Sequence, residues 1–291
     1  MTDKKEKNII SAVLGVLLAV ILTLLSSRII NGDDASKRGY DVVIFGDSII
    51  AYTQDDTSVA NMLSEKTGLS IGDFSFGGTL LSFNAENGTL GSRKNYLCLA
   101  SITQSLLADD FSIQKNANTT DPATDYFDER VAELENLDLK DTDVVIIEHC
   151  LNDYHCAIPI GDENSTSEYT YCGALRLSVE NIRKINPDIR VIFVSPTEKW
   201  MMDGTNGSEF DYGGGTLDEY VNAQRKMAEV LGAEYVDMYG LYDTASDVFL
   251  DSEGRPVEGY AYTVEGTHPN YYGREAISSL LAGYLSGTSS R

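Results

Sequence analysis

Residues 41–50 read DVVIFGDSII, and this stretch indicates the fold class of the chain. Its apolar part, residues 42–45, has β-branched and aromatic side chains without polar alternation, which is typical of a strand buried on both faces in a parallel sheet. The run stops at Gly46, and Asp47 and Ser48 follow directly. Open α/β sheets bind ligands beyond the carboxyl ends of their strands, so Ser48 stands where a functional group is expected. The same residues also suit an ordinary turn into a helix capped by Asp47 or Ser48.

The rest of the chain alternates strand-like runs with helical patterns. We predict further strands at residues 70–76, 144–147, 191–194 and 234–238. Apolar residues at helical spacing predict helices near 59–66, 93–107, 127–134, 175–182, 217–231 and 277–284. This alternation implies an α/β fold with a parallel sheet covered by helices on both faces. The sequence has no internal repeat and no second domain boundary.

The composition limits the classes of partner. The 291-residue chain has a net charge of −23, and 42% of its residues are apolar. That apolar content allows one sizeable core. The acidic balance argues against nucleic acid as a partner, because phosphate binding needs clustered Lys and Arg. It argues equally against electrostatic docking on anionic lipid.

The amino-terminal segment differs from the rest of the chain. Lys4, Lys5 and Lys7 precede an uncharged run that, with two serines, extends over residues 9–27. Such a run is close to the shortest that spans a bilayer, and basic residues on its amino side keep that side in the cytoplasm. Because no A-x-A cleavage site follows, we predict an uncleaved transmembrane signal anchor rather than a cleaved signal peptide.

Export would place four cysteines, Cys98, Cys150, Cys156 and Cys172, in an oxidising compartment. Cys156 and Cys172 bracket a polar loop and could form a disulfide, although the sequence does not determine the pairing. The cysteine spacing fits no zinc-binding pattern.

Polar residues of one chemical set follow the predicted strands. They lie at residues 46–48 (GDS), 74–78 (FSFGG) and 150–153 (CLND), and a fourth group at 265–270 (EGTHPN) precedes the last predicted helix. Because a parallel sheet gathers its carboxyl-end loops on one edge, a serine, a glycine N–H, an asparagine amide and a histidine can meet there.

These groups are the parts of an acyl-transfer site. Ser48 would attack a carbonyl, His268 would take and return its proton, and a carboxylate would hold the imidazole in the required tautomer. An oxyanion needs preorganised donors, each worth about 2.7–4 kcal/mol of the barrier. The N–H groups of Ser48 and Gly78 and the Asn152 side-chain amide could supply three such donors.

From residue 41 onward the sequence resembles the SGNH hydrolases, also called GDSL-type esterases. Residues 46–49 resemble the G-D-S-L block of that family, and residues 73–78 resemble its N-x-G-x-x-G block. Residues 152–153 match the end of its G-x-N-D block, and residues 265–269 resemble its D-x-x-H-P block. The resemblance implies a three-layer α/β/α, flavodoxin-like fold. It also implies site roles for four residues: Ser48 as nucleophile, Gly78 as oxyanion glycine with Gly77 competing, Asn152 as side-chain donor, and His268 as base.

Two residues depart from the family pattern. Cys150 stands where the family usually has glycine, so a turn with positive φ at this position would cost on the order of 1 kcal/mol. Glu265 stands where the family usually has aspartate. Its longer side chain must fold back to reach His268, or a backbone carbonyl must orient the ring instead. We assign the orienting role to Glu265.

Other arrangements of these residues are open alternatives. His149, Asp153 and His155 could bind a metal ion, and Cys150 could act as a nucleophile beside His149, although buried structural histidines are the simpler interpretation. The aromatic residues near the motifs could stack on a sugar, line an acyl pocket or pack in the core; they are Tyr52, Tyr154, Trp200, Tyr271 and Tyr272.

Together these features predict a cytoplasmic end at residues 1–8, an anchor at 9–27, a linker at 28–39 and a catalytic domain at 40–291. The protein would be a cell-membrane, single-pass serine esterase with its domain outside the cytoplasm, or a secreted one if the anchor is cleaved. By resemblance and location, it would remove small acyl groups, such as O-acetyl groups on carbohydrate, through an acyl-enzyme without metal or organic cofactor. The alternatives are a polysaccharide O-acetyltransferase, a lysophospholipase and a non-catalytic carbohydrate-binding module. The oligomeric state cannot be read from the sequence.

Overall fold

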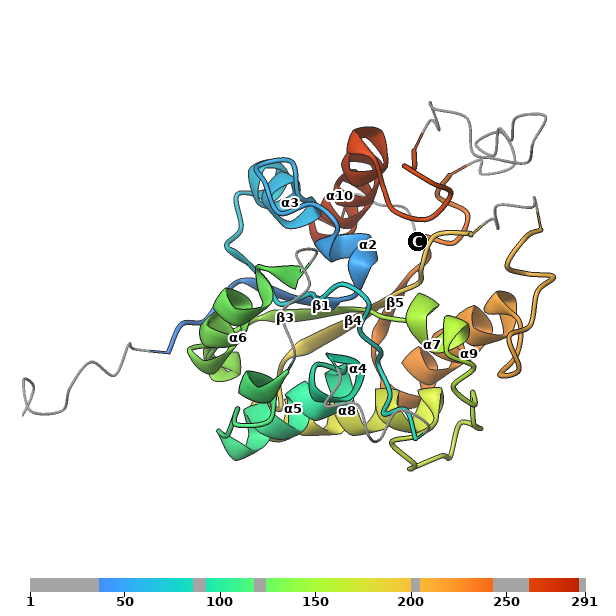
Figure 1. Ribbon diagram of the computed structural model, residues 1–291. Coiled ribbons are helices and arrows are strands. Elements are labelled where there is room, and N and C mark those ends of the chain that lie inside the picture. The colour runs from blue at the N-terminus through green and yellow to red at the C-terminus, as the bar shows by residue number, and fades with distance from the viewer. Residues whose placement is uncertain (1–36, 86–92, 118–123, 200–204, 243–261, 288–291) are drawn as a thin grey trace, which may run out of the picture. The chain divides into compact units, whose positions relative to one another are not determined.

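Parallel strands form the central sheet of the protein, shown in Figure 1. The computed structural model describes residues 37–85, 93–117, 124–199, 205–242 and 262–287, and the elements below belong to the unit Gly39–Arg291. The strands within the described residues are β1 (Val42–Gly46), β2 (Ile71–Asp73), β3 (Val144–Glu148), β4 (Arg190–Val194) and β5 (Glu234–Val236). Their spatial order is β2-β1-β3-β4-β5, the flavodoxin-like order. The predicted α/β fold with a central parallel sheet is therefore confirmed.

The register of the two central strands sets up the site. All five residues of β1 are buried, and so are all five of β3. Gly46, the last residue of β1, pairs with Glu148, the last residue of β3. The chain therefore leaves both strands at the same level of the same sheet edge, which brings Ser48 close to the segment after residue 148.

Helices cover the sheet in two layers (Figure 1). On one face lie α3 (Val59–Thr67) and α10 (Tyr271–Leu285), which pack against each other. On the other face lie α5 (Leu99–Ala108), α8 (Tyr171–Ile185) and α9 (Leu217–Leu231), with α8 packed between its two neighbours. The remaining described helices are α2 (Ser48–Ala51), α4 (Arg93–Tyr96), α6 (Phe127–Glu135), α7 (Leu151–His155) and the 3₁₀ turns η1 (Gln114–Asn116) and η3 (Leu139–Asp141).

Local capping explains where several helices begin and end. The Ser58 hydroxyl accepts the Asn61 N–H at the start of α3, and Gly68 ends that helix with φ +73°. Thr216 and Glu219 form a capping box at the start of α9. Asn270 caps α10 by accepting the N–H groups of Tyr272 and Gly273. Each of these caps satisfies backbone groups that have no partner inside the helix.

The helix predicted at 93–107 is two helices in the structure. Cys98 is extended, with φ −68° and ψ 150°, and it separates α4 from α5. The backbone N–H groups of Leu99 and Ala100 bond to the carbonyls of Leu80 and Leu81 instead of continuing the first helix. These contacts with a distant segment override the local helical preference. The prediction of one continuous helix at 93–107 was therefore wrong.

The second strand is shorter than predicted. Strand β2 ends at Asp73, whereas the apolar pattern extended to residue 76. The chain nevertheless continues along β1, because Phe74 N–H bonds to Ile44 O and Phe76 N–H bonds to Gly46 O. The loop that follows is thereby held beside the carboxyl end of β1.

The described residues include all four cysteines but not the predicted anchor. None of the helices among the described residues combines the length and apolar character needed to cross a bilayer, and the predicted anchor at 9–27 lies outside those residues. All four cysteines are described, and each is a free thiol. The considered disulfide between Cys156 and Cys172 is therefore absent from this structure.

Candidate active site

Ser48 is the first residue of α2, directly after the buried strand β1. The Asp47 carboxylate caps this helix by accepting the Ile49 N–H at 2.9 Å. Gly46 is required before it, since a Cβ there would lie 2.8 Å from Ile50 Cγ1 and 2.9 Å from Ser75 Oγ. The strand thus ends in a tight turn that leaves the Ser48 side chain half-buried at the sheet edge.

His268 reaches Ser48 from the loop before α10. The distance between His268 Nε2 and Ser48 Oγ is 2.9 Å, although the two residues are 220 positions apart in the chain. A bridge between Thr263 and Pro269 and a 2.8 Å hydrogen bond from Val264 N–H to His268 O close this loop. The imidazole is therefore held by a short, hydrogen-bonded loop rather than by a free chain.

Glu265 contacts the other nitrogen of the ring. Its Oε1 hydrogen-bonds to His268 Nδ1 and also accepts the His268 backbone N–H at 3.3 Å. The longer side chain of glutamate folds back over three residues to make both contacts. On the ring face, Tyr52 stacks on His268 with centroids 4.4 Å apart and planes 13° apart. Carboxylate and tyrosine together restrict the orientation of the imidazole.

The two glycines of the second loop differ in their hydrogen bonding. The N–H of Gly77 donates to Tyr126 Oη at 2.9 Å. The turn from Phe76 to Thr79 is closed by the Thr79 N–H bonding to Phe76 O at 3.3 Å, and Gly78 within it has φ +72°. Since Gly77 already has an acceptor and Gly78 needs the left-handed region, Gly78 is the better candidate for an oxyanion donor.

Asn152 lies on α7, opposite these glycines. Its Nδ2 donates to Thr79 O at 3.0 Å and to Asp47 Oδ2 at 3.2 Å. Both N–H groups of the amide are thus in use, and donation to an oxyanion would require exchange of one of them. The preceding Cys150 has φ −171°, an extended angle open to any residue, so the strain considered for a side chain at this position does not arise.

A cavity of about 640 Å³ opens beside these groups. The cavity is lined by the candidate catalytic residues Ser48 and His268 and by Asn152, Gly77 and Gly78. The other described lining residues are Ala51, Tyr52, Gln54, Thr124, Asp125 and Tyr126. None of the described lining residues is leucine, isoleucine, valine, methionine or phenylalanine, although most of the surface that they expose to the cavity is apolar.

The alternative sites considered for this region are not supported by the geometry. No group of three His, Cys, Asp or Glu residues in the described part of the chain is placed to hold a metal ion, and this includes His149, Asp153 and His155. Asp153 instead accepts the N–H groups of Leu81 and Ser82. Burial raises the pKa of the Cys150 thiol well above its usual value, which opposes a role as nucleophile.

The other two histidines, His149 and His155, are not among the described lining residues of the cavity. Burial lowers the pKa of His149 to about 3. His155 Nε2 lies 2.7 Å from Lys199 Nζ, and burial lowers the pKa of that lysine to about 8.

The aromatic residues near the motifs lie in different parts of the structure. Tyr52 lines the cavity, whereas Tyr154 is buried and donates to Phe210 O. Tyr271 and Tyr272 are exposed, and Trp200 lies outside the described residues. Sequence reasoning missed Gln54 and Tyr126 as cavity residues, because neither belongs to a motif and both are brought in by the fold.

A family model matches most of the chain. Residues 44–276 match the model of the GDSL-like lipase/acylhydrolase family, which is more than half of the chain. No curated protein matches the sequence.

Solved structures resemble the fold at low sequence identity. A protein from Lactobacillus plantarum is 17% identical with a TM-score of 0.58, and the match covers 87% of this chain and all of that one. A possible lipase from Chitinophaga pinensis is 18% identical with a TM-score of 0.55, covering 86% of this chain and all of that one. A salicylyl-acyltransferase from a tetracycline biosynthetic pathway is 15% identical with a TM-score of 0.50, covering 88% of this chain and 56% of that one. At such identities the likeness concerns the fold alone.

The match along residues 44–276 establishes the class of protein. The chain belongs to the GDSL-like lipase/acylhydrolase family and is an ester hydrolase, as the sequence motifs predicted.

A buried acid lies beneath the site. Glu148 is completely buried, and neither carboxyl oxygen has a hydrogen-bond partner. Burial, and next the nearby Asp47 carboxylate, raise the pKa of Glu148 well above 4.5. Burial also raises the pKa of Asp47 to about 6. The folded state therefore favours a proton on Glu148 at pH values where the unfolded chain has already lost it.

Replacing Glu148 with glutamine should therefore stabilise the protein increasingly as the pH rises. In the wild type, the unfolded state loses this proton near its ordinary pKa while the folded state retains it, so the stabilising contribution falls as pH rises toward the folded pKa. Glu148→Gln removes that loss, and each unit of raised pKa corresponds to about 1.4 kcal/mol. Urea unfolding at about pH 5 and about pH 8 measures the effect, with the exposed Glu65→Gln as control. A difference from wild type that does not change with pH would contradict this interpretation.

Proposed function

We propose that the protein is a serine esterase in which Ser48 is the nucleophile, His268 the general acid and base, and Glu265 the group that orients the imidazole. The observation that supports this most directly is the 2.9 Å hydrogen bond between Ser48 Oγ and His268 Nε2, with Glu265 on the opposite ring nitrogen. A carboxylate on Nδ1 favours the tautomer whose Nε2 can accept the serine proton.

The reaction would proceed in two halves. Ser48 Oγ attacks the acyl carbon while His268 Nε2 takes its proton, and His268 then gives that proton to the departing alcohol oxygen. Water, deprotonated by His268, attacks the acyl-enzyme, and the proton returns to Ser48 as the acid leaves. The oxyanion of each half-reaction would accept from the Ser48 and Gly78 N–H groups. Asn152 would join them by exchanging its longer hydrogen bond, the 3.2 Å bond to Asp47.

We further propose a short acyl group and a polar alcohol, such as an O-acetyl group on carbohydrate. The cavity of about 640 Å³ exceeds what an acetyl group needs, so part of the alcohol would also enter it. Its walls offer amide, hydroxyl and carboxylate groups and the rings of Tyr52 and Tyr126, which suit a sugar. A long alkyl chain would find no aliphatic side chain larger than that of Ala51 among the described lining residues.

The location of the enzyme is a separate proposal that rests on the amino-terminal sequence. The basic residues and the uncharged run at 9–27 support a single-pass anchor, with a linker at 28–39 and the hydrolase domain from residue 40 outside the cytoplasm. That location would bring the site to extracellular or cell-surface esters.

Removal of the proposed catalytic groups should abolish esterase activity. Ser48→Ala and His268→Ala should each lower kcat for p-nitrophenyl acetate by on the order of 10³-fold or more. Glu265→Gln should lower kcat by up to about 10⁴-fold, because an amide does not hold the imidazole in the required tautomer. Glu265→Asp is the matched control, since it retains a carboxylate, and should keep far more activity. Equal rates from wild type, Ser48→Ala and His268→Ala would refute the proposed mechanism.

The lack of large aliphatic side chains in the described lining predicts a preference for short acyl groups. Between p-nitrophenyl acetate and p-nitrophenyl decanoate, kcat/KM should fall by at least about tenfold, because the described lining has no aliphatic side chain larger than that of Ala51 to pack against the added methylenes. Initial rates with Ser48→Ala as background measure this. A value that rises with chain length would favour a lysophospholipase instead. Acetylated product formed on an added polysaccharide, in place of free acetate, would indicate an acetyltransferase.

A further inference from the structure

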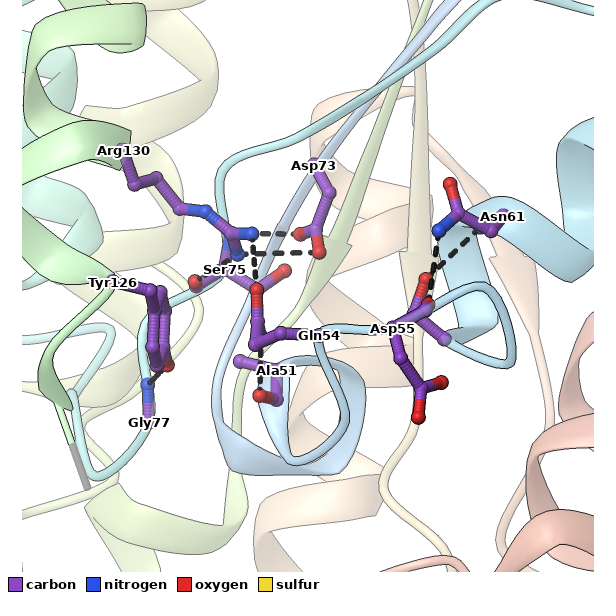
Figure 2. Close-up of polar contacts among 10 residues, drawn as sticks. Ala51, Gln54, Asp55, Asn61, Asp73, Ser75, Gly77, Tyr126 and Arg130 are labelled. Atoms are coloured by element: carbon purple, nitrogen blue, oxygen red, sulfur yellow. Dashed lines mark hydrogen bonds and ion pairs between the residues drawn. The ribbon is translucent and has the colours of Figure 1, made fainter. Parts of the chain in front are cut away.

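Arg130 connects the two segments that carry the site, as Figure 2 shows. It lies on α6, and its Nη2 donates to Gln54 Oε1 at 2.6 Å while its Nη1 donates to Ser75 O at 2.7 Å. Its Nη1 also forms an ion pair with Asp73 Oδ2 at 3.2 Å. Both charged side chains are only 12% exposed, so solvent screens this network weakly.

Each partner of Arg130 belongs to a part of the site. Gln54 follows the helix that begins with Ser48, and its Nε2 donates back to Ala51 O at 2.5 Å. Asp73 ends β2, and its Oδ1 accepts the Ser75 N–H at 2.9 Å. Ser75 is two residues before Gly77. One guanidinium therefore joins the nucleophile segment to the loop that holds the two glycines.

Tyr126 continues this connection to the glycines. Its hydroxyl accepts the Gly77 N–H at 2.9 Å, and its ring lies under the Arg130 guanidinium, with Cζ 5.0 Å from the ring centroid (Figure 2). A T-shaped contact with Phe127, at 4.8 Å between centroids, also packs against the ring. Arginine and tyrosine thus hold each other in place.

The hydrogen bond from Gly77 N–H to Tyr126 Oη affects the direction in which the neighbouring Gly78 N–H points. Gly78 N–H belongs to the peptide between the two glycines, and the turn from Phe76 to Thr79 does not use it for closure. Two consecutive glycines have wide backbone freedom, so the direction of that peptide needs an external restraint. The bond from Gly77 N–H to Tyr126 Oη provides one, next to the turn closure.

We propose that Tyr126 and Arg130 are positioning residues that hold the Gly78 N–H in place to stabilise the oxyanion above Ser48. This inference rests on the proposed function. In this role the two residues act through the loop, and the Tyr126 hydroxyl is distinct from the ring face that lines the cavity. Tyr126 fixes the Gly77 peptide, and Arg130 fixes the distance between that loop and the nucleophile segment. The planar arginine fork serves three acceptors at once, which a lysine cannot reproduce.

The test is the discrimination between an ester and its thionoester. Sulfur is larger than oxygen and a weaker hydrogen-bond acceptor, so a well-formed oxyanion site accelerates p-nitrophenyl acetate more than its thiono analogue. Tyr126→Phe keeps the ring and loses the acceptor for Gly77. We expect kcat for the acetate to fall about tenfold with KM unchanged, which is less than the 10²–10³-fold cost of losing an oxyanion donor altogether. The thionoester rate should fall much less, so the ratio of the two rates decreases. Arg130→Lys should lower the ratio in the same direction.

Controls separate positioning from loss of structure. Tyr284→Phe removes a comparable hydroxyl, which bonds to Glu234 Oε2 at 3.0 Å away from the cavity, and should leave both rates unchanged. If Arg130→Lys does not fold, judged by its thermal unfolding, Tyr126→Phe decides the question alone.

Three outcomes would overturn the inference. They are equal losses with ester and thionoester, no change in Tyr126→Phe, and a raised KM at unchanged kcat, which would indicate direct substrate contact. Ser48→Ala in the same assay separates a failure of the proposed function from a failure of this inference. A wild type no faster than Ser48→Ala would overturn the proposed function and this inference together, whereas an active wild type matched by Tyr126→Phe would overturn only the inference.

Discussion

The alignment of β1 with β3 is the constraint on which the rest of the site depends. Both strands are buried along their whole length, and the pairing of Gly46 with Glu148 ends them at one level. A shift of register by one residue would exchange the faces of a strand and separate Ser48 from the segment that carries Asn152. The hydrogen bond between Asn152 and Asp47, across 105 residues, therefore depends on packing in the apolar centre of the sheet.

The sequence revealed the parts of the fold that have local causes. The uninterrupted apolar run at 42–45 predicted the buried central strand, and the motif residues after the strands indicated the family. The break at Cys98 could not be predicted, because it arises when Leu99 and Ala100 bond to a distant segment. Short α7 was also missed, since five residues give too little pattern to recognise.

The candidate site likewise contains residues that the sequence identified and residues that it did not. The motif residues could be named from the sequence. In the structure His268 contacts both Ser48 and Glu265, while Gly78 and Asn152 line the cavity beside them. Arg130, Tyr126 and Gln54 belong to no motif, and their contacts join segments that are distant in the sequence. The hydrogen bond from Asn152 to Asp47 could likewise not be predicted from the sequence, because it joins residues 105 positions apart.

We propose that the fold, and not the serine alone, makes Ser48 reactive. Peptide mapping by mass spectrometry after treatment with a fluorophosphonate tests it most directly, because this reagent modifies serines activated by a neighbouring base. We predict one adduct, on Ser48, in the native protein, and none in urea-unfolded protein or in His268→Ala. An unmodified Ser48 in the native protein, or equal labelling with and without His268, would contradict the account.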